Sequence, residues 1–404
     1  MSGAVVVTGL GLVTPAGVGV AESWAGICSG LPTAVVEPLL APSPVRLACR
    51  VTGFDPERVL GAERAHRTAR FGQFALAAVA EALIDAGLDP AQWDGSRVGM
   101  VLGNSVGGLD ACVLAQETMR DRGAQAVSPL LLPHYLSNMA AGQTTIAHRI
   151  TGPCLVVSTA CASGTTAIGT ALDMLRARRC DIVVAGGTEA PLTPVVATGF
   201  AQLGALSRAE DAKGASRPFD SRRDGFVLAE GAGVLILERE EHALARGARV
   251  RARVAGRGET ADAHHPVAPH PDGTGLERAV RDALADADLS ASEVDHVNAH
   301  ATGTPRGDAA EAAVLARVFP HRPPVTSIKG VTGHSLGAAG AIEAVCAVLS
   351  ITHRTIPGTA NLRDPDPATD LHLVPSTLRR TVKAVLTHSV GFGGQNAALV
   401  VTAP

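Results

Sequence analysis

Short runs rich in valine, isoleucine and leucine alternate with longer alanine-rich stretches along the chain, and this alternation constrains the fold most. The short runs are expected to be strands: Ala4–Leu10, Val98–Leu102, Leu155–Ser158, Asp181–Ala185, Gly233–Glu238, Arg249–Val254, Val294–Asn298, Val325–Ile328, Lys383–Thr387 and Ala397–Thr402. The longer stretches are expected to be helices: Phe71–Ala86, Ala162–Arg178, Leu276–Ala287, Asp308–Val318 and Ala338–Thr352. Several runs are almost continuously aliphatic, which is typical of strands covered on both faces. The pattern predicts an α/β fold with helices over mixed sheets.

Two of the expected helices resemble each other. The stretches after Cys161 and after Gly337 each follow a strand and a loop of small residues, and both keep apolar residues at helical spacing. Glu343 is the only charge in the second stretch, so this helix is expected to be buried on most sides. The similarity predicts two related halves, residues 1–245 and 246–404, and the polar segment 204–223 is expected to be a surface loop.

The composition excludes several classes of function. Hydrophobic residues make up 46% of the chain and charged residues 18%, which favours a large core over disorder. The net charge of −3 and the aromatic content of 3% do not favour a nucleic acid or an anionic membrane as partner. We expect neither a membrane span nor a signal peptide, because no long uncharged apolar stretch and no basic leader are evident, and we expect a cytoplasmic protein.

The seven cysteines show no paired spacing, which favours a reducing compartment over a disulfide framework or a zinc ribbon. They are Cys28, Cys49, Cys112, Cys154, Cys161, Cys180 and Cys346. His264, His265 and His270 are close in sequence, but no spaced carboxylate or cysteine completes a ligand set, so no metal site is predicted.

Cys161 lies where a strand ends and a helix begins, in the segment VSTACASG. A cysteine at this position faces the positive end of the helix dipole, which favours the thiolate, and its backbone N–H can reach a reacting oxygen. The sequence alone leaves open whether Cys161 is a nucleophile or an inert buried thiol.

Three further segments carry polar groups at the ends of predicted strands. His300 follows one strand in NAHATGTP and is either a proton donor or a structural histidine, while Asp308 and Glu311 open the next helix. Lys329 and His334 flank a glycine-bearing loop that lacks the pattern of a nucleotide-binding P-loop. The segment GFGG at 391–394 is either a tight hairpin or a place where backbone N–H groups approach a ligand.

The order of these segments closely resembles the β-ketoacyl-acyl-carrier-protein synthases, above all the elongating ketosynthases of type II fatty-acid and polyketide systems. The residues that carry the resemblance are TACASG, NAHATGTP, SIKGVTGHSLGAAG and GFGG, together with RPFDSRRDGFVLAEGAG and VVVTGLGLVTPAG. The resemblance spans almost the whole chain. It implies the thiolase fold, a five-layered αβαβα duplication that is usually dimeric, as a homodimer or as a heterodimer with a chain-length-factor subunit.

The resemblance also implies roles for individual residues. Cys161 would take the acyl chain from acyl carrier protein, and His300 and His334 would act on the malonyl group. Lys329 would support the histidines, Glu311 would fix the Lys329 loop, and Phe392 would be the mobile gate. The N–H groups of Cys161 and Phe392 would form an oxyanion hole.

The remaining implied roles concern substrate and partner. Thr302, Thr304 and Gly393 would line the substrate channel, Phe200 would lie beside the acyl pocket, and Arg67 would help to dock the carrier protein. No metal or cofactor is implied beyond the phosphopantetheine of the carrier protein.

The chain departs from the usual family pattern at Ala301, Gly330 and His388, where glycine, serine or alanine, and asparagine are common. These departures favour a specialised polyketide or unusual acyl pathway over housekeeping fatty-acid synthesis. A non-catalytic chain-length factor is an alternative, which Cys161 argues against. A degradative thiolase would need a second cysteine in the C-terminal glycine loop, and an initiating ketosynthase would have asparagine in place of His334.

Overall fold

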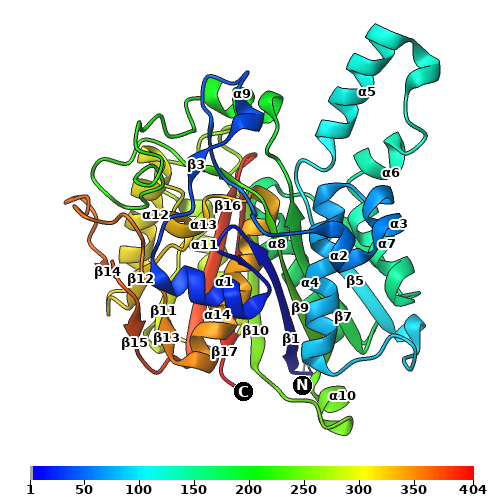
Figure 1. Ribbon diagram of the computed structural model, residues 1–404. Coiled ribbons are helices and arrows are strands. Elements are labelled where there is room, and N and C mark those ends of the chain that lie inside the picture. The colour runs from blue at the N-terminus through cyan, green and yellow to red at the C-terminus, as the bar shows by residue number, and fades with distance from the viewer. Residues whose placement is uncertain (1–2) are drawn as a thin grey trace.

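The computed structural model describes residues 3–404, and Figure 1 shows a central sheet region with helices inside it and on both sides. All the expected strands and helices are present with shifted ends. The strands of the first half are β1 (Val5–Thr14), β5 (Val98–Gly103), β6 (Cys154–Val157), β7 (Ile182–Glu189) and β9 (Gly231–Arg239). Those of the second half are β10 (Ala252–Ala261), β11 (His296–Asn298), β12 (Pro324–Thr326), β14 (His372–Leu373), β16 (Ala384–Gly391) and β17 (Gln395–Thr402).

The helices expected from the sequence are α4 (Arg70–Ala86), α8 (Ser163–Arg176), α11 (Thr274–Asp286), α12 (Pro305–Val318) and α14 (Ala339–His353). The sequence pattern missed shorter or less regular helices: α1 (Val20–Ser29), α2 (Pro56–Leu60), α3 (Ala62–Arg67), α5 (Leu109–Arg122), α6 (Leu131–Tyr135), α7 (Met139–His148), α9 (Pro194–Gln202), α10 (Glu240–Ala245) and α13 (Lys329–Thr332). It also missed β14 and the short strands β2 (Gly17–Val18), β3 (Val35–Val36), β4 (Leu47–Cys49), β8 (Leu228–Ala229), β13 (Thr355–Ile356) and β15 (Leu378–Arg379). Residues 204–223 form turns and bends, as expected for a loop, but the expectation of a surface position is wrong for residues 215–220, where most residues are buried and Phe219 packs in the core.

The sheet is built from two copies of one strand pattern. The order is β14-β12-β11-β16-β17-β10-β1-β9-β7-β5-β6, so the strand order on one side of the β10–β1 contact mirrors that on the other. In each half the inner strands pair antiparallel and the outer ones parallel. The duplication expected from the sequence is therefore confirmed, whereas its boundary at residues 245 and 246 stays a prediction.

The helices complete five layers. Helices α8 and α14 lie between the two halves of the sheet and contact strands of both, whereas α4 covers the outer face of the first half and α11 that of the second. The two inner helices lie so close together that a Cβ on Gly164 would be 2.7 Å from the Ala341 backbone nitrogen. Glycine at this position therefore lets the starts of α8 and α14 meet, and both helices follow loops that carry candidate catalytic residues.

The segment Leu336–His353, which includes α14, is long and apolar enough to cross a membrane, but 89% of it is buried inside the protein. Its only charged residue, Glu343, is 1% exposed. The segment is therefore a core helix, which confirms the burial predicted from its single charge.

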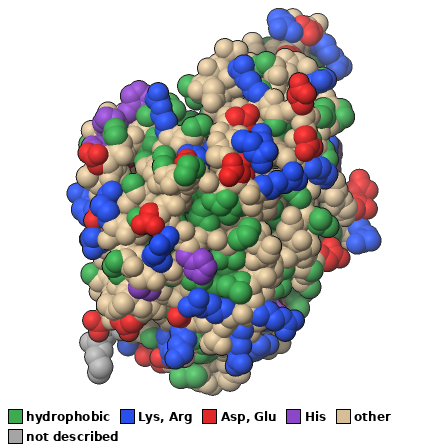
Figure 2. Space-filling model, turned by 90° about the vertical axis from the view of Figure 1, so that its left-hand side faces the viewer, with side chains coloured by type: hydrophobic (Ala, Val, Ile, Leu, Met, Phe, Trp, Pro, Cys, Tyr) green, Lys and Arg blue, Asp and Glu red, His purple; other side chains and the backbone are tan. Residues whose placement is uncertain are grey.

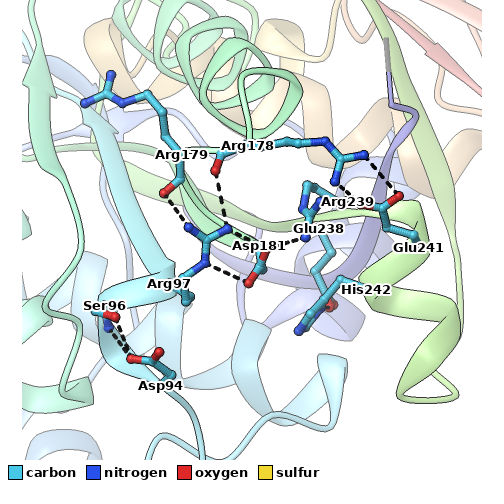
Figure 3. A network of polar contacts seen from close by, with 10 residues as sticks. All are labelled: Asp94, Ser96, Arg97, Arg178, Arg179, Asp181, Glu238, Arg239, Glu241 and His242. Atoms are coloured by element: carbon cyan, nitrogen blue, oxygen red, sulfur yellow. Dashed lines mark hydrogen bonds and ion pairs between the residues drawn. The ribbon is translucent and has the colours of Figure 1, made fainter. Parts of the chain in front are cut away.

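A network of ion pairs lies at the end of the sheet where β7 begins (Figure 3). This end is opposite the carboxyl ends of β5, β6 and β7. Arg97 donates two hydrogen bonds of 2.9 and 2.8 Å to Asp181, and Arg239 contacts the same carboxylate. The Arg97 contact, with that of Arg239, lowers the pKa of Asp181 to about 2. On the face drawn in Figure 2, charges of both signs surround a hydrophobic area near the centre.

Candidate active site

Cys161 lies on a sharp turn between β6 and α8. The turn includes Ala160 with a positive φ of 50°, a conformation that costs a residue with a Cβ some backbone strain. Ser163 holds the turn, since its hydroxyl donates to the Ala160 carbonyl at 2.6 Å and accepts the Thr159 N–H at 3.0 Å. The strand-to-helix elbow expected around Cys161 is therefore present, with a short 3-10 turn before α8.

The Cys161 thiol lies in the protein interior, where it is 8% exposed. Burial raises the pKa of this thiol to about 12; the Lys329 charge lowers it, whereas Glu189 and Glu343 raise it further. This differs from the expectation of a thiolate, because loss of solvation outweighs the favourable position at the start of the helix. In the resting site the sulfur carries its proton, which must leave when a thioester forms.

His300 and His334 come from separate loops and meet beside Cys161. His300 follows β11, and His334 lies between α13 and α14, held by its backbone N–H to the Val227 carbonyl at 2.8 Å. The ring centroids are 5.3 Å apart and the ring planes are at 85°. Burial lowers the pKa of both histidines well below the usual range, and the nearby Lys329 charge lowers it further. Both imidazoles are therefore neutral at physiological pH and each carries one N–H.

Lys329 pairs with Glu343, and each side chain is 1% exposed. Burial raises the pKa of Glu343 to about 7, and the Lys329 charge opposes this rise. The sequence reasoning did not assign Glu343 a role, although a lone charge in an otherwise apolar helix was the available signal.

Glu311 hydrogen-bonds with a backbone N–H group and with a histidine, and its expected role of fixing the Lys329 loop stays a prediction. One carboxylate oxygen accepts the Ala301 N–H at 2.9 Å and the other lies 2.6 Å from His388 Nε2. The link to the Lys329 segment is indirect, because the Ser327 hydroxyl donates to the Ala301 carbonyl at 2.8 Å and accepts the Lys329 N–H at 3.3 Å. Glu311 therefore fixes the backbone beside His300 first.

The GFGG segment forms the hairpin between β16 and β17. The Gly393 N–H donates to the Pro266 carbonyl at 2.7 Å, and the Asp262 N–H donates to the Gly394 carbonyl at 2.9 Å. A Cβ on Gly391 would lie 2.5 Å from the Thr159 carbonyl oxygen and 3.3 Å from the Cys161 nitrogen. The absence of a side chain at Gly391 thus lets this hairpin approach the backbone of the Cys161 turn.

One cavity of about 100 Å³ joins most of the expected site residues. Among its lining residues are Cys161, Phe200, Phe226, His270, His300, Thr302, Thr304, Asp308, Glu311, His334, Gly391 and Phe392. Four of the lining residues carry rings that follow one another in a row. The ring centroids are 5.9 Å apart for Phe392 and Phe200, 5.3 Å for Phe200 and Phe226, and 5.2 Å for Phe226 and His334. The sequence analysis assigned no site role to Phe226, although this residue lies in RPFDSRRDGFVLAEGAG, one of the segments that carry the family resemblance.

Three expected site residues lie elsewhere. Lys329 is buried and is not among the residues that line the cavity, and Gly393 is exposed on the hairpin. Arg67 lines a separate surface groove with Arg64 and pairs loosely with Glu63 at 3.6 Å. The structure shows that these three residues do not line the cavity. Their expected roles stay predictions.

The three histidines 264, 265 and 270 lie in the loop that packs on the hairpin. The His265 Nδ1 atom accepts the N–H groups of Val267 and Ala268 at 3.0 and 2.9 Å, and the His264 and His270 rings are 4.9 Å apart. Over residues 3–404, no group of three or more histidine, cysteine or acidic side chains is placed to hold a metal ion. His265 thus shapes the loop through its hydrogen bonds.

Comparison with protein families and known proteins gives one consistent result. Residues 2–243 match the model of the β-ketoacyl synthase N-terminal domain, and residues 251–363 match that of the C-terminal domain. The 3-oxoacyl-[acyl-carrier-protein] synthase 2 of Vibrio harveyi is 39% identical over 404 residues, which cover 98% of this chain and 97% of the relative.

Two solved structures are similar over the whole of this chain and of their own. The ishigamide ketosynthase/chain length factor superposes with a TM-score of 0.94 at 34% sequence identity, covering 100% of both chains. A ketosynthase bound to the hexaketide, in complex with its type II polyketide synthase acyl-carrier protein, gives a TM-score of 0.91 at 32% identity, again with 100% of both chains covered.

Proposed function

Because this chain belongs to the β-ketoacyl synthase family, we propose that it condenses a malonyl group with an acyl chain, both delivered by acyl carrier protein. The product is a β-ketoacyl thioester, and carbon dioxide is released. The observation that carries the proposal is a single cavity lined by one thiol, Cys161, and two neutral imidazoles, His300 and His334.

Acyl transfer comes first. The Cys161 sulfur attacks the carbonyl carbon of the acyl thioester, and the bond from that carbon to the pantetheine sulfur breaks. The proton of the buried thiol passes to the departing pantetheine thiol, and a neutral imidazole in the cavity is a suitable carrier for it. The N–H groups of Cys161 and Phe392 are the proposed donors to the oxygen of the tetrahedral intermediate.

Condensation follows on the malonyl thioester. The bond to the carboxylate breaks, carbon dioxide leaves, and the electron pair forms an enolate whose oxygen accepts hydrogen bonds from His300 and His334. The enolate carbon attacks the acyl carbonyl on Cys161, and the carbon–sulfur bond breaks. The Cys161 thiolate then takes up a proton from solvent, because the reaction as a whole consumes one, and returns to its resting thiol, which agrees with its raised pKa.

One observation supports a specialised acyl or polyketide pathway, with housekeeping fatty-acid synthesis as the alternative. The two structural neighbours named above are described as polyketide-type or chain-length-factor systems. Gly330, one departure from the family pattern, has a steric reason that is independent of the pathway, because a Cβ there would lie 2.4 Å from the Ala360 carbonyl oxygen.

A second subunit is part of the proposal. Strand β6 ends the sheet, and Leu155 on this strand is 41% exposed. Helices α5 and α6 project from the body in Figure 1 and expose apolar side chains, with Leu114 at 65% and Leu132 at 59%. Free sheet edges and large apolar surfaces favour association. Light scattering should give the mass of two chains, either for this chain alone or only after co-expression with a chain-length-factor-like subunit.

A cytoplasmic location and independence from metals or other cofactors complete the proposal. Among the described residues all seven cysteines are unpaired, which suits a reducing compartment. Every step above uses protein groups and the thioester itself.

Mass spectrometry of the purified protein tests the proposal directly. After incubation with an acyl-carrier thioester, the acyl mass should appear on the peptide that contains Cys161. Addition of malonyl-carrier protein should remove it and give a β-ketoacyl-carrier product. An unmodified Cys161 peptide with every acyl chain length offered, from a folded dimer, would favour the non-catalytic chain-length-factor role.

A further inference from the structure

His388 contacts the buried carboxylate of Glu311, which in turn holds the loop that carries His300. His388 lies on β16, four residues before Phe392, and its side chain is fully buried. Its Nε2 atom lies 2.6 Å from Glu311 Oε1. A carboxylate can only accept, so Nε2 carries the hydrogen and donates it.

Glu311 also hydrogen-bonds with the backbone beside His300. Its second oxygen accepts the Ala301 N–H at 2.9 Å, and the Ala301 carbonyl accepts the Ser327 hydroxyl at 2.8 Å. On the other side, the Ala299 N–H donates to the Thr326 carbonyl at 2.8 Å. The residues on both sides of His300 are therefore held by hydrogen bonds.

The His300 ring itself has little else to orient it. Among the described residues its Nδ1 atom has no hydrogen-bond partner, and the same is true of His334. Rings of this kind are usually oriented by a carboxylate or carbonyl at the second nitrogen. Here the direction of the His300 ring depends on its backbone and on the His334 ring at 5.3 Å.

The two buried carboxylates near the site have separate partners. Lys329 pairs with Glu343, and His388 bonds Glu311. Glu311 is 4% exposed, so loss of the His388 donor would leave one oxygen of a buried carboxylate without its side-chain partner.

We propose that His388 is a positioning residue for decarboxylation: its imidazole anchors Glu311, and Glu311 fixes the loop that aims His300 at the malonyl thioester. The inference rests on the proposed condensing function. His388 does not line the cavity and touches no reacting atom.

The test separates the two half-reactions of the full-length protein. His388→Leu removes the donor, and the kcat for release of carbon dioxide from malonyl-carrier protein should fall about 100-fold, as expected for a misplacement of about 1 Å. KM for malonyl-carrier protein and the rate of Cys161 acylation should stay near wild type. His388→Gln keeps an N–H donor at similar reach and should restore much of the decarboxylation rate.

Two further variants exclude a purely structural effect. His242 also contacts a buried carboxylate, with its Nδ1 atom 2.7 Å from Glu238 Oε2, but it lies among the ion pairs of Figure 3, so His242→Leu is a control that should leave both half-reactions unchanged. The double variant His388→Leu/Glu311→Ala should be no slower than Glu311→Ala alone, because His388 acts only through Glu311.

The outcomes are distinguishable. A His388→Leu protein that decarboxylates at the wild-type kcat overturns the inference, as does a double variant whose losses multiply. If His388→Leu does not fold, His388→Met takes its place in both comparisons, because methionine also lacks the N–H donor and its flexible side chain is tolerated in cores. A wild-type protein that neither decarboxylates nor accepts an acyl group would instead contradict the proposed function.

Discussion

The rings of His300 and His334 meet edge to face, with their centroids 5.3 Å apart, and both line the cavity that contains Cys161. The two histidines come from loops after different strands of the second half of the chain. Because burial keeps both rings neutral, they can donate two hydrogen bonds to one oxygen without placing two positive charges side by side.

Removal of either ring should impair decarboxylation first. We expect His300→Ala or His334→Ala to lower the rate of carbon dioxide release from malonyl-carrier protein about 10²–10³-fold, the usual effect of losing one donor to a developing oxyanion. Acyl transfer to Cys161, measured by mass spectrometry, should fall less. Equal losses in both half-reactions would contradict this division of roles.

Replacement of the nucleophile should have the opposite effect. Cys161→Ala should abolish acyl transfer, because no sulfur is left to form the thioester, while malonyl decarboxylation continues. The exposed Cys154 offers the control, and Cys154→Ala should keep both activities. Loss of both activities in a well-folded Cys161→Ala protein would show that the sulfur is needed for more than holding the acyl chain.

The alkylation of Cys161 should depend steeply on pH. With a pKa raised to about 12 by burial, the thiolate fraction rises about tenfold per pH unit through the neutral and mildly alkaline range. Iodoacetamide labelling of the Cys161 peptide should therefore accelerate continuously from pH 7 to about pH 9. A plateau near pH 7 would indicate a stabilised thiolate instead.

The buried pair of Lys329 and Glu343 should be far more sensitive to loss of one partner than to loss of both. Lys329→Met leaves an unpaired buried carboxylate, and we expect the free energy of unfolding to drop by about 3–5 kcal/mol. Lys329→Met/Glu343→Leu should recover much of this loss in urea unfolding. A double variant that is as unstable as the sum of the single ones would rule out direct pairing as the cause.

His296 should make the protein sensitive to mild acid. Burial lowers its pKa to about 3, so between pH 6.5 and 3 the unfolded chain binds a proton that the folded chain does not. The stability advantage of wild type over His296→Asn is complete above pH 6.5 and should shrink by about 2 kcal/mol on going from pH 7.5 to pH 5. Urea unfolding of both proteins at these pH values measures the difference, and a constant difference would contradict the shift.

Arg67 should affect the encounter with carrier protein and not the chemistry. It is exposed, at 67% for the side chain, in a groove away from the cavity. Arg67→Glu should raise KM for acyl-carrier protein about tenfold at low salt and less at high salt, with kcat unchanged. Arg178→Glu, which reverses another exposed arginine, is the control and should leave KM unchanged.

Much of this protein could be predicted from the order of its residues. The aliphatic runs predicted the strands, because strands covered on both faces need continuous apolar sequence. The small residues around Cys161 predicted a turn into a helix, and the turn is there with Ala160 at a φ of 50°. The motifs TACASG, NAHATGTP and GFGG contain Cys161, His300 and Phe392, which line the cavity, but GFGG also contains Gly393, which does not.

Only the tertiary structure decided which groups interact and in which charge state. Lys329 pairs with Glu343, and Glu311 pairs with His388, across separations of 14 and 77 residues that no local pattern encodes. The Cys161 position at the start of a helix predicted a thiolate, but the surrounding elements remove the thiol from water and keep it protonated. The loss of water around a titratable group depends on all the elements that pack against it. The short sequence segment that carries the group therefore does not predict its pKa shift.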